Sequence, residues 1–221
     1  DPDSGKLLSD ALTARGINVM TSTSPLQLLG RDSVRAIQLN DQTLICTDLV
    51  IIATGITPNR ELAQNAGLAC GRGIQVNAQL QTSAPDIFAL GECCEFNDET
   101  FGLVEPGYQQ AKILASVLAG PTEGAAYQPS VTATRLKISG IPVFSCGQQA
   151  PDEHTESLVW QDFATGSYSH LLVRDNRLVG AILIGNTSQG PWYQELIAGN
   201  ADIDLFRAQL PFGKPFCKAA A

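Results

Sequence analysis

Five consecutive apolar residues, LVIIA at positions 49–53, constrain the fold of this chain more than any other segment. They follow Asp48 and end at Thr54 and Gly55, before a Pro-Asn pair turns the chain. An apolar run without alternation is typical of a strand that is buried on both faces, as in a parallel sheet covered by helices. The segment therefore predicts an α/β fold.

A second segment, TSAPDIFALGE at residues 82–92, predicts a strand that leads to a cofactor site. Turn residues precede an apolar run, and Gly91 then allows another group to approach the backbone closely. Glu92 follows at the carboxyl end of the strand, where ligands bind in open α/β sheets. A carboxylate at this place is suited to accept hydrogen bonds from the hydroxyl groups of a sugar or ribityl chain.

The remaining pattern in the first half of the chain predicts alternating helices and short strands. Helices are expected at residues 5–16, 61–66 and 107–118, the last with Pro106 just ahead of its first turn and with Ile113, Leu114, Val117 and Leu118 facing a core. Strands are expected at residues 17–20, 26–29, 34–39, 43–46 and 74–77. The segments at 26–46 predict a three-stranded meander.

A stretch rich in Gly, Ala and Pro at residues 120–128 predicts a linker, and the pattern after it is mainly extended. The expected strands are residues 131–139, 142–146, 157–161, 167–173 and 177–184. Asp175 and Asn176 predict a tight hairpin turn between the last two. A helix at 189–199, capped near Thr187 or Ser188, completes a small sheet-and-helix domain.

Composition excludes several classes of function. The chain has 221 residues, of which 44% are hydrophobic, and a net charge of −8, which disfavours a nucleic-acid surface. No apolar run approaches the length of about 20 residues that a membrane-spanning helix needs, and the first residues lack a signal-peptide pattern. The sequence therefore predicts a cytoplasmic protein that binds neither nucleic acid nor membrane.

The spacing of the cysteines and histidines supports neither a metal site nor a catalytic nucleophile. The six cysteines form no C-x-x-C pair and no metal-ligand pattern, so we expect reduced thiols and no metal site. Cys93 and Cys94 are adjacent, but neighbouring Cβ atoms fit disulfide geometry poorly, which favours packing over a redox role. His154 and His170 have no Ser or Asp partner at a suggestive spacing, so no catalytic residue is predicted.

Together, the ATG motif at 53–55 and the ALGEC motif at 89–93 resemble the rear half of the flavoprotein pyridine-nucleotide reductases. The usual acid of that family is Asp; the GEC variant here looks most like the flavoprotein part of bacterial NAD(P)H nitrite reductases and assimilatory nitrate reductases. The resemblance extends over almost the whole chain, through the runs at 101–120, 131–147 and 173–197.

The resemblance implies an α/β fold with partial doubly wound FAD- and NAD(P)H-binding domains, followed by a small α+β interface domain. The implied boundaries are residues 1–59 for the NAD(P)H part, 60–123 for the FAD part and 124–221 for the interface domain. It places five residues at FAD, namely Gly91, Glu92, Val104, Pro106 and Gly107. It places Thr54 and Gly55 on the NAD(P)H side.

The implied activity is electron transfer from NAD(P)H through FAD to a nitrite or nitrate reductase centre. The implied partner is the rest of the same polypeptide or a redox subunit, with iron-sulfur and sirohaem or molybdenum centres. The helix after the acid would direct its amino end at the flavin and stabilise negative charge on it.

Neither glycine-rich fingerprint of that family is found, because the glycine phrase at residues 70–74, CGRGI, lacks the pattern and reads as a loop. The chain therefore looks like the carboxyl-terminal part of a longer protein. We expect residues 1–221 alone to be inactive, to retain neither FAD nor NAD(P)H tightly, and to form a homodimer through unpaired apolar strands.

Two other readings of the chain stay open. One is a ferredoxin, rubredoxin or disulfide reductase of the same superfamily. The other is a non-catalytic dimerisation or docking module, in which Glu92 is a solvated strand end, Gly55 a turn glycine and Pro106-Gly107 only a helix entry.

Overall fold

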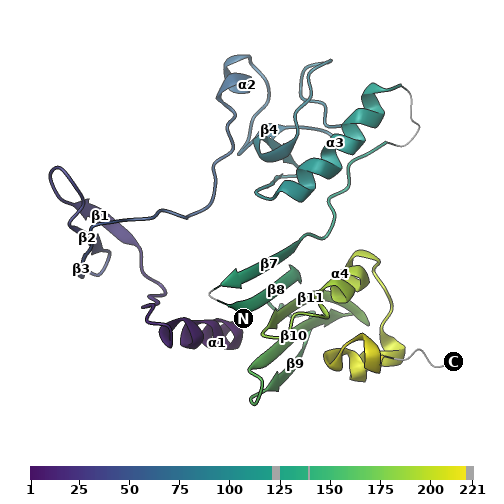
Figure 1. The fold of residues 1–221 in the computed structure, drawn as a ribbon. Helices are drawn as coiled ribbons and strands as arrows, with labels where there is room; N and C mark the ends of the chain where they lie inside the picture. The colour runs from purple at the N-terminus through teal and green to yellow at the C-terminus, as the bar shows by residue number, and fades with distance from the viewer. Residues whose placement is uncertain (121–124, 139, 218–221) are drawn as a thin grey trace. The chain divides into compact units, whose positions relative to one another are not determined.

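The computed structural model describes residues 1–120, 125–138 and 140–217 (Figure 1). Backbone contacts divide the chain into two units: one contains Asp1–Leu8 and Ile56–Ala221, and the other is Ser9–Gly55. The first helix, α1 (Pro2–Thr13), begins three residues before the predicted start. The division into three domains stays a prediction, and each unit is described by itself.

The smaller unit contains the predicted meander. Its three antiparallel strands are β1 (Pro25–Leu29), β2 (Ala36–Leu39) and β3 (Leu44–Cys46), with β2 in the middle. Leu39 is its buried apolar residue. The prediction is confirmed because turn residues separate three short β-forming runs, which is a local signal.

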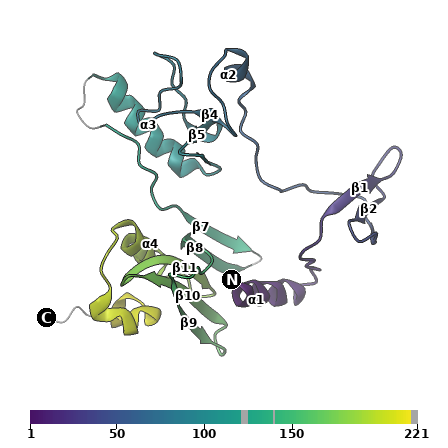
Figure 2. The same ribbon diagram turned by 180° about the vertical axis from the view of Figure 1, so that it is seen from behind.

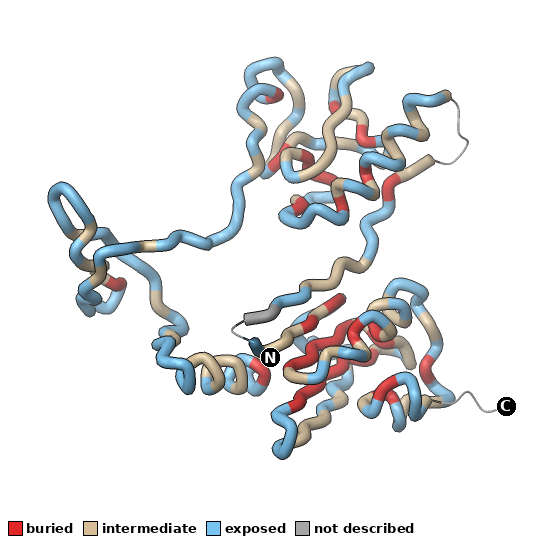
Figure 3. The backbone as a smooth tube through the Cα atoms, in the orientation of Figure 1, coloured by how far each residue is buried: buried red, intermediate tan, exposed pale blue. Residues whose placement is uncertain are grey.

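The strands predicted at residues 17–20 and 49–53 are wrong: both segments are irregular. Ile51 and Ile52, predicted to be buried on both faces, are 81% and 75% exposed. A strand needs a neighbour to satisfy its backbone N–H and C=O groups, and no described strand pairs with either segment. The exposed path of this part of the chain is pale blue in Figure 3.

In the larger unit, residues 56–120 form a small α/β layer. Its helices are α2 (Glu61–Asn65) and α3 (Val104–Leu118), and its sheet joins β4 (Ile74–Gln75), β5 (Cys94–Phe96) and β6 (Glu99–Thr100). The β4–β5 pair is parallel. Its buried core consists of Leu80, Cys94, Phe96, Phe101 and Tyr127.

Three details of this layer differ from the sequence predictions. The apolar run 86–90 forms only one isolated bridge, Gln81 to Phe88, so the run is not part of the β4–β5–β6 sheet. Helix α3 starts before Pro106, which lies in its first turn, where a missing N–H does no harm. Ile113 and Leu114 pack on the core as predicted, but Leu118, in the last turn, is exposed.

The five strands predicted after the linker all form, in one antiparallel sheet of order β7-β8-β11-β10-β9 (Figure 2). Their bounds are β7 (Ala133–Ile138), β8 (Ile141–Gly147), β9 (Glu156–Asp162), β10 (Ser167–Arg174) and β11 (Arg177–Ile184). Asp175 and Asn176 turn the β10–β11 hairpin with φ of 49° and 55°, as predicted.

Helix α4 (Gly190–Ala198) packs on β8 and β11, and two 3-10 segments, η2 (Asp204–Phe212) and η3 (Lys214–Phe216), complete the described chain. The predicted cap at Thr187 or Ser188 is wrong, because Gln189 occupies the N-cap position and its side chain makes no cap bond. The central strands carry most of the buried residues, drawn red in Figure 3. No helix among the described residues is long and apolar enough to span a membrane.

Candidate functional site

The predicted flavin acid lies in a single 3-10 turn, η1 (Gly91–Cys93), and not at the end of a strand. Gly91 has φ of +83°, a left-handed conformation that favours glycine. The turn leads directly into β5, so the acid sits between the Gln81–Phe88 bridge and a strand of the parallel pair. The side chain of Glu92 is exposed and forms no hydrogen bond or ion pair with a described residue.

Helix α3 is tied to this turn through Gln110. The backbone N–H of Gly91 donates to Gln110 Oε1 at 2.6 Å, and the Gln110 side chain is fully buried. A Cβ placed on Gly107 would lie 3.7 Å from the Gly91 Cα, so the first turn of α3 also approaches the glycine backbone closely. The start of α3 and the Glu92 turn are therefore adjacent.

The two adjacent cysteines pack and do not bridge, as predicted. Cys93 is partly exposed, and its thiol lies 3.4 Å from the Leu90 carbonyl oxygen. Cys94 is buried, and burial raises the pKa of its thiol to about 11. Cys94 is therefore a protonated thiol near neutral pH, without the reactivity of a thiolate.

The amino end of α3 presents unpaired backbone donors. Its N-cap residue, Leu103, offers no side-chain cap bond, so the N–H groups of Val104 and Glu105 have no capping partner from it. Pro106, also in this turn, is buried and has no N–H. The helix dipole adds partial positive charge at this end, which favours an anionic or electron-rich group.

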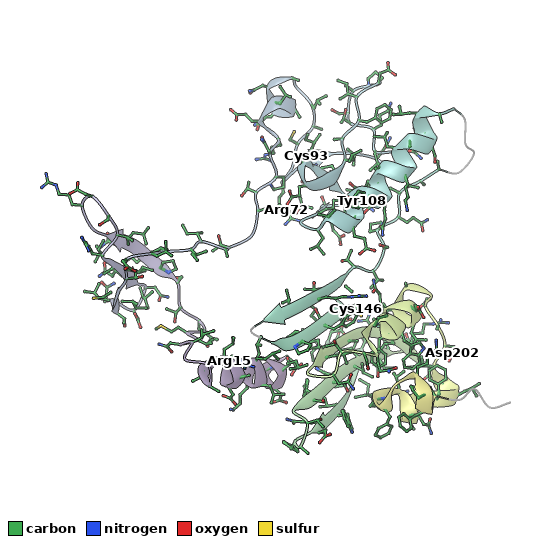
Figure 4. All side chains as sticks on the ribbon, viewed as in Figure 1. Arg15, Arg72, Cys93, Tyr108, Cys146 and Asp202 are labelled. Carbon is green, nitrogen blue, oxygen red and sulfur yellow. The ribbon has the colours of Figure 1, made fainter. Side chains whose placement is uncertain are left out.

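These pieces surround one hollow of about 450 Å³. Its lining residues are Leu90, Gly91, Glu92, Gly102, Leu103, Val104, Gly107, Tyr108 and Ala111. Four of the five residues predicted at FAD line it, and the fifth, Pro106, is buried in the same helical turn. Figure 4 labels Tyr108 on α3 and Cys93 in the turn.

Sequence reasoning named Val104 but missed the rest of the apolar side of this hollow, which includes Leu103 and Tyr108. Leu103, Val104 and Tyr108 line it while remaining 48%, 71% and 68% exposed. Val104, Tyr108 and Ala111 have the i, i+4, i+7 spacing of one helix face, which is the signal that could have identified them. The hollow thus combines an exposed apolar wall, a free carboxylate and helix amides, which is the combination that a planar, polar-ended ligand needs.

The glycine phrase CGRGI forms a loop, as predicted, and supports the site from behind. The buried Glu95 carboxylate on β5 accepts the N–H of Gly73 at 2.7 Å, and this bond holds the pKa of Glu95 below its usual value. A Cβ on Gly71 would collide with the same carboxylate. The loop is therefore shaped to fit Glu95, and it fixes the β4–β5 pair next to the Glu92 turn.

The NAD(P)H side of the prediction is not assembled by the described residues. Thr54 and Gly55 end the other unit in irregular, exposed backbone. Gly55 has φ of +96°, and no atom lies within 4 Å of the place where its Cβ would be. Their role stays a prediction.

One cluster gives His170 the Asp and Ser partners that no suggestive spacing in the sequence indicated. His170 Nδ1 lies 2.9 Å from Asp1 Oδ2, and its Nε2 lies 3.0 Å from Ser157 Oγ. The Tyr168 hydroxyl donates to the other Asp1 oxygen at 2.9 Å. These partners are up to 169 positions apart in the chain, so spacing could not reveal them. The ring is buried, burial lowers its pKa, and we interpret the cluster as the attachment of the start of α1 to β10.

His154, in contrast, is exposed, as predicted. Among the described residues, no group of three or more His, Cys, Asp or Glu side chains could hold a metal ion. The hollow beside Glu92 is thus the candidate site, because it unites most of the residues that the sequence predicted at FAD.

Comparisons with known proteins identify the family of the chain. The family model described as pyridine nucleotide-disulphide oxidoreductase matches residues 1–112, and the model described as rubredoxin NAD+ reductase C-terminal domain matches residues 133–201. Among curated relatives, a nitrite reductase [NAD(P)H] of Bacillus subtilis is 38% identical over 92% of this chain and 25% of its own length. An assimilatory nitrate reductase electron transfer subunit of the same organism is 36% identical over 95% of this chain and 27% of its own length. The chain thus spans about a quarter of the length of these relatives.

Solved structures show the same architecture. The ferredoxin reductase for the CYP199A2 system of Rhodopseudomonas palustris superposes with a TM-score of 0.79 at 23% identity, over 92% of this chain and 51% of that one. An NADH:rubredoxin oxidoreductase of Clostridium acetobutylicum gives 0.66 at 25% identity, over 94% of this chain and 50% of that one. The α/β fold class is confirmed, and the chain belongs to the pyridine nucleotide-disulphide oxidoreductase family.

Proposed function

We propose that this chain supplies the rear part of the flavin site in an NAD(P)H-dependent flavoprotein reductase that delivers electrons to a nitrite or nitrate reductase centre. The observation that carries the proposal is the hollow in which Gly91, Glu92, Val104 and Gly107 meet at the amino end of α3. The similarity to nitrite reductase and to a nitrate reductase electron transfer subunit supports the choice of acceptor.

The residues around the hollow fit FAD. The unpaired Glu92 carboxylate is placed to accept hydrogen bonds from ribityl or ribose hydroxyl groups. Val104 and Gly107 of the first α3 turn line the hollow, and the amino end of a helix stabilises negative charge close to it. Leu103, Val104 and Tyr108 provide an apolar surface that excludes water from a ring system. Bound FAD would supply the chemistry itself, since it accepts hydride and releases single electrons.

Thr54 and Gly55 are proposed to approach the NAD(P)H side. The positive φ of Gly55 and the open space beside it support a close approach of a ligand to the backbone. The proposed electron acceptor is the rest of the same polypeptide or a separate redox subunit, because the relatives are about four times as long as this chain or are named as an electron transfer subunit.

The test is made on the full-length polypeptide that contains these 221 residues. We expect the purified protein to show flavin absorption, which NADH or NADPH bleaches without oxygen and which nitrite or nitrate restores. A full-length protein with no bound flavin would overturn the proposal and favour the docking-module alternative.

Glu92 allows a sharper test within the same protein. Replacing Glu92→Ala removes hydrogen bonds to a charged acceptor, so we expect the Kd for FAD to rise by about tenfold or more. Glu92→Asp, which restores the acid usual in the resembling family, is the matched control and should stay within a few-fold of the wild type. Equal FAD affinity of the wild type and Glu92→Ala would contradict the assignment of Glu92.

A rubredoxin reductase is the second candidate function. It is supported by the rubredoxin NAD+ reductase C-terminal domain match at residues 133–201 and by an NADH-rubredoxin oxidoreductase of Clostridium acetobutylicum, 28% identical over 92% of this chain and 49% of its own length. Rubredoxin and nitrite should be compared as acceptors for the NAD(P)H-reduced protein. Faster oxidation by rubredoxin would select this candidate.

A further inference from the structure

The strongest unexplained feature outside the lining of the hollow is a buried polar side chain behind it. Gln110, on α3, has no exposed surface. Its Oε1 accepts the Gly91 N–H at 2.6 Å, and the Cys94 thiol lies 3.7 Å from the same oxygen. One amide oxygen therefore joins α3 to both ends of the Glu92 turn.

Core packing does not explain a glutamine at this position. Its Nε2 is buried and has no hydrogen-bond partner among the described residues. The Tyr127 phenol is near the Gln110 amide. Burial raises the pKa of this phenol, and the amide opposes that rise. Tyr127 and Gln110 are nevertheless not within hydrogen-bond geometry of each other. An unpaired buried donor destabilises a core, and a leucine would fill the place without that loss. The role of the amide is therefore to be sought in the hydrogen bond that its oxygen accepts.

The Gln110 oxygen restrains the backbone of the Glu92 turn, which has few other restraints. Gly91 has φ of +83°, and glycine at such a conformation is intrinsically free to leave it. Beyond it, Glu92 is exposed and makes no contact that would fix its direction. The Gly91 N–H bond to Gln110 thus ties the start of the Glu92 turn to α3.

Cys94 closes the turn from its other side. Its thiol lies 3.3 Å from the Gly91 carbonyl oxygen and 3.7 Å from Gln110 Oε1, so its S–H has an acceptor on the turn and an acceptor on α3. The buried thiol stays protonated near neutral pH and so remains a donor. Cys94 therefore has a structural task in this turn, and its place next to Cys93 needs no redox explanation.

We propose that Gln110, supported by the Cys94 thiol, is a positioning residue that fixes the Glu92 carboxylate relative to the amino end of α3 and so sets the affinity of the flavin site. The proposal depends on the proposed function, because it assigns Glu92 to the flavin. Gln110 itself does not line the hollow and is not expected to contact the ligand.

The test compares Gln110→Met with Gln109→Met in the full-length flavoprotein. Methionine keeps the length of the side chain and removes the amide. Gln109 is the matched control because it is the neighbouring glutamine on the same helix and accepts the Ser130 hydroxyl at 2.8 Å, away from the hollow. We expect Gln110→Met to raise the Kd for FAD about tenfold and Gln109→Met to change it less than about twofold.

A double-mutant cycle with Glu92→Ala separates positioning from general stability. If Gln110 acts through Glu92, the two substitutions lose the same interaction, so the double variant should bind FAD about as weakly as Glu92→Ala alone. Fully additive losses would overturn the proposal, because they would mean that Gln110 acts independently of Glu92. Unchanged FAD affinity of Gln110→Met would also overturn it.

Cys94 provides a second measurement if Gln110→Met does not fold. Cys94→Ser keeps a donor and Cys94→Ala removes it, so we expect FAD affinity to fall several-fold in the alanine variant and to be largely restored in the serine variant. Equal affinity of the two variants would overturn the role of the thiol. A wild-type protein without flavin would refute the proposed function itself, whereas flavin binding that is lost with Glu92→Ala but insensitive to Gln110 would refute only the positioning role.

Discussion

At the scale of single residues, two glycines that lie close together at the hollow differ in backbone conformation. Gly91 has φ of +83°, whereas Gly107 lies inside α3. We expect Gly91→Ala to lower the free energy of unfolding by about 1–2 kcal/mol, because a Cβ disfavours the left-handed conformation. Space is not the reason, since no atom lies within 4 Å of the added Cβ. Urea denaturation measures the change.

Gly107→Ala is the control for that substitution. Its Cβ would meet Gly91 Cα at 3.7 Å, an ordinary contact, and alanine favours a helix by about 1 kcal/mol over glycine. We expect equal or higher stability. Equal losses in both variants would show that the positive φ of Gly91 is not what matters.

Glu95 makes the stability of residues 56–120 depend on pH. Its pKa is lowered from 4.5 in the folded protein, first by the hydrogen bond from the Gly73 N–H. A group with a lowered folded-state pKa stabilises the fold above its unfolded pKa and loses that contribution as pH falls through the folded value. We expect Glu95→Gln to be less stable than the wild type at pH 7, and the difference to shrink as pH falls below 4.5.

Thermal unfolding of both proteins between pH 3 and pH 8 tests this expectation, with Glu99→Gln as the control, since Glu99 lies in β6 but is exposed. A wild-type and Glu95→Gln difference that does not vary over this range would contradict the assignment.

At the scale of elements, the contact of α4 with the sheet depends on one small residue. A Cβ on Gly190 would lie 2.6 Å from the Phe144 ring, which is buried on β8. We expect Gly190→Ala to push α4 from β8 and to reduce stability by about 1–3 kcal/mol, because a filled core cannot absorb the added group. Ser188→Ala should stay within about 0.5 kcal/mol, since Ser188 does not cap the helix.

Guanidinium denaturation of the two variants tests both statements. A stable Gly190→Ala would show that the Phe144 ring can move aside. A large loss of stability in Ser188→Ala would contradict the structure, because it would mean that Ser188 does cap α4.

At the scale of the whole molecule, the exposed run at 49–53 predicts self-association. Ile51 and Ile52 are largely exposed in unpaired backbone, and such a segment tends to recruit another chain. We expect residues 1–221 alone to sediment with a concentration-dependent mass and Ile51→Lys to shift them toward the monomer. Leu62→Lys is the control, because Leu62 is equally exposed but lies alone on α2. A monomer at all concentrations would contradict this expectation.

The sequence by itself determined the features that have a local cause. The meander, the β10–β11 hairpin at Asp175 and Asn176 and the five strands after the linker follow from turn residues and short apolar runs that act over a few positions. Four of the lining residues of the hollow could be named because they lie in two short runs, 91–92 and 104–107, that resemble the family.

Only the tertiary structure decided the contacts between distant positions. The Gly91 bond to Gln110 spans 19 positions, the Glu95 bond to Gly73 spans 22, and His170 meets Asp1 across 169. The strand predicted at 49–53 did not form for the same reason. Its apolar residues favour burial, but burial and backbone pairing require a neighbouring strand. Local conformation is encoded where it occurs, whereas a contact depends on the path of all the chain between its two partners.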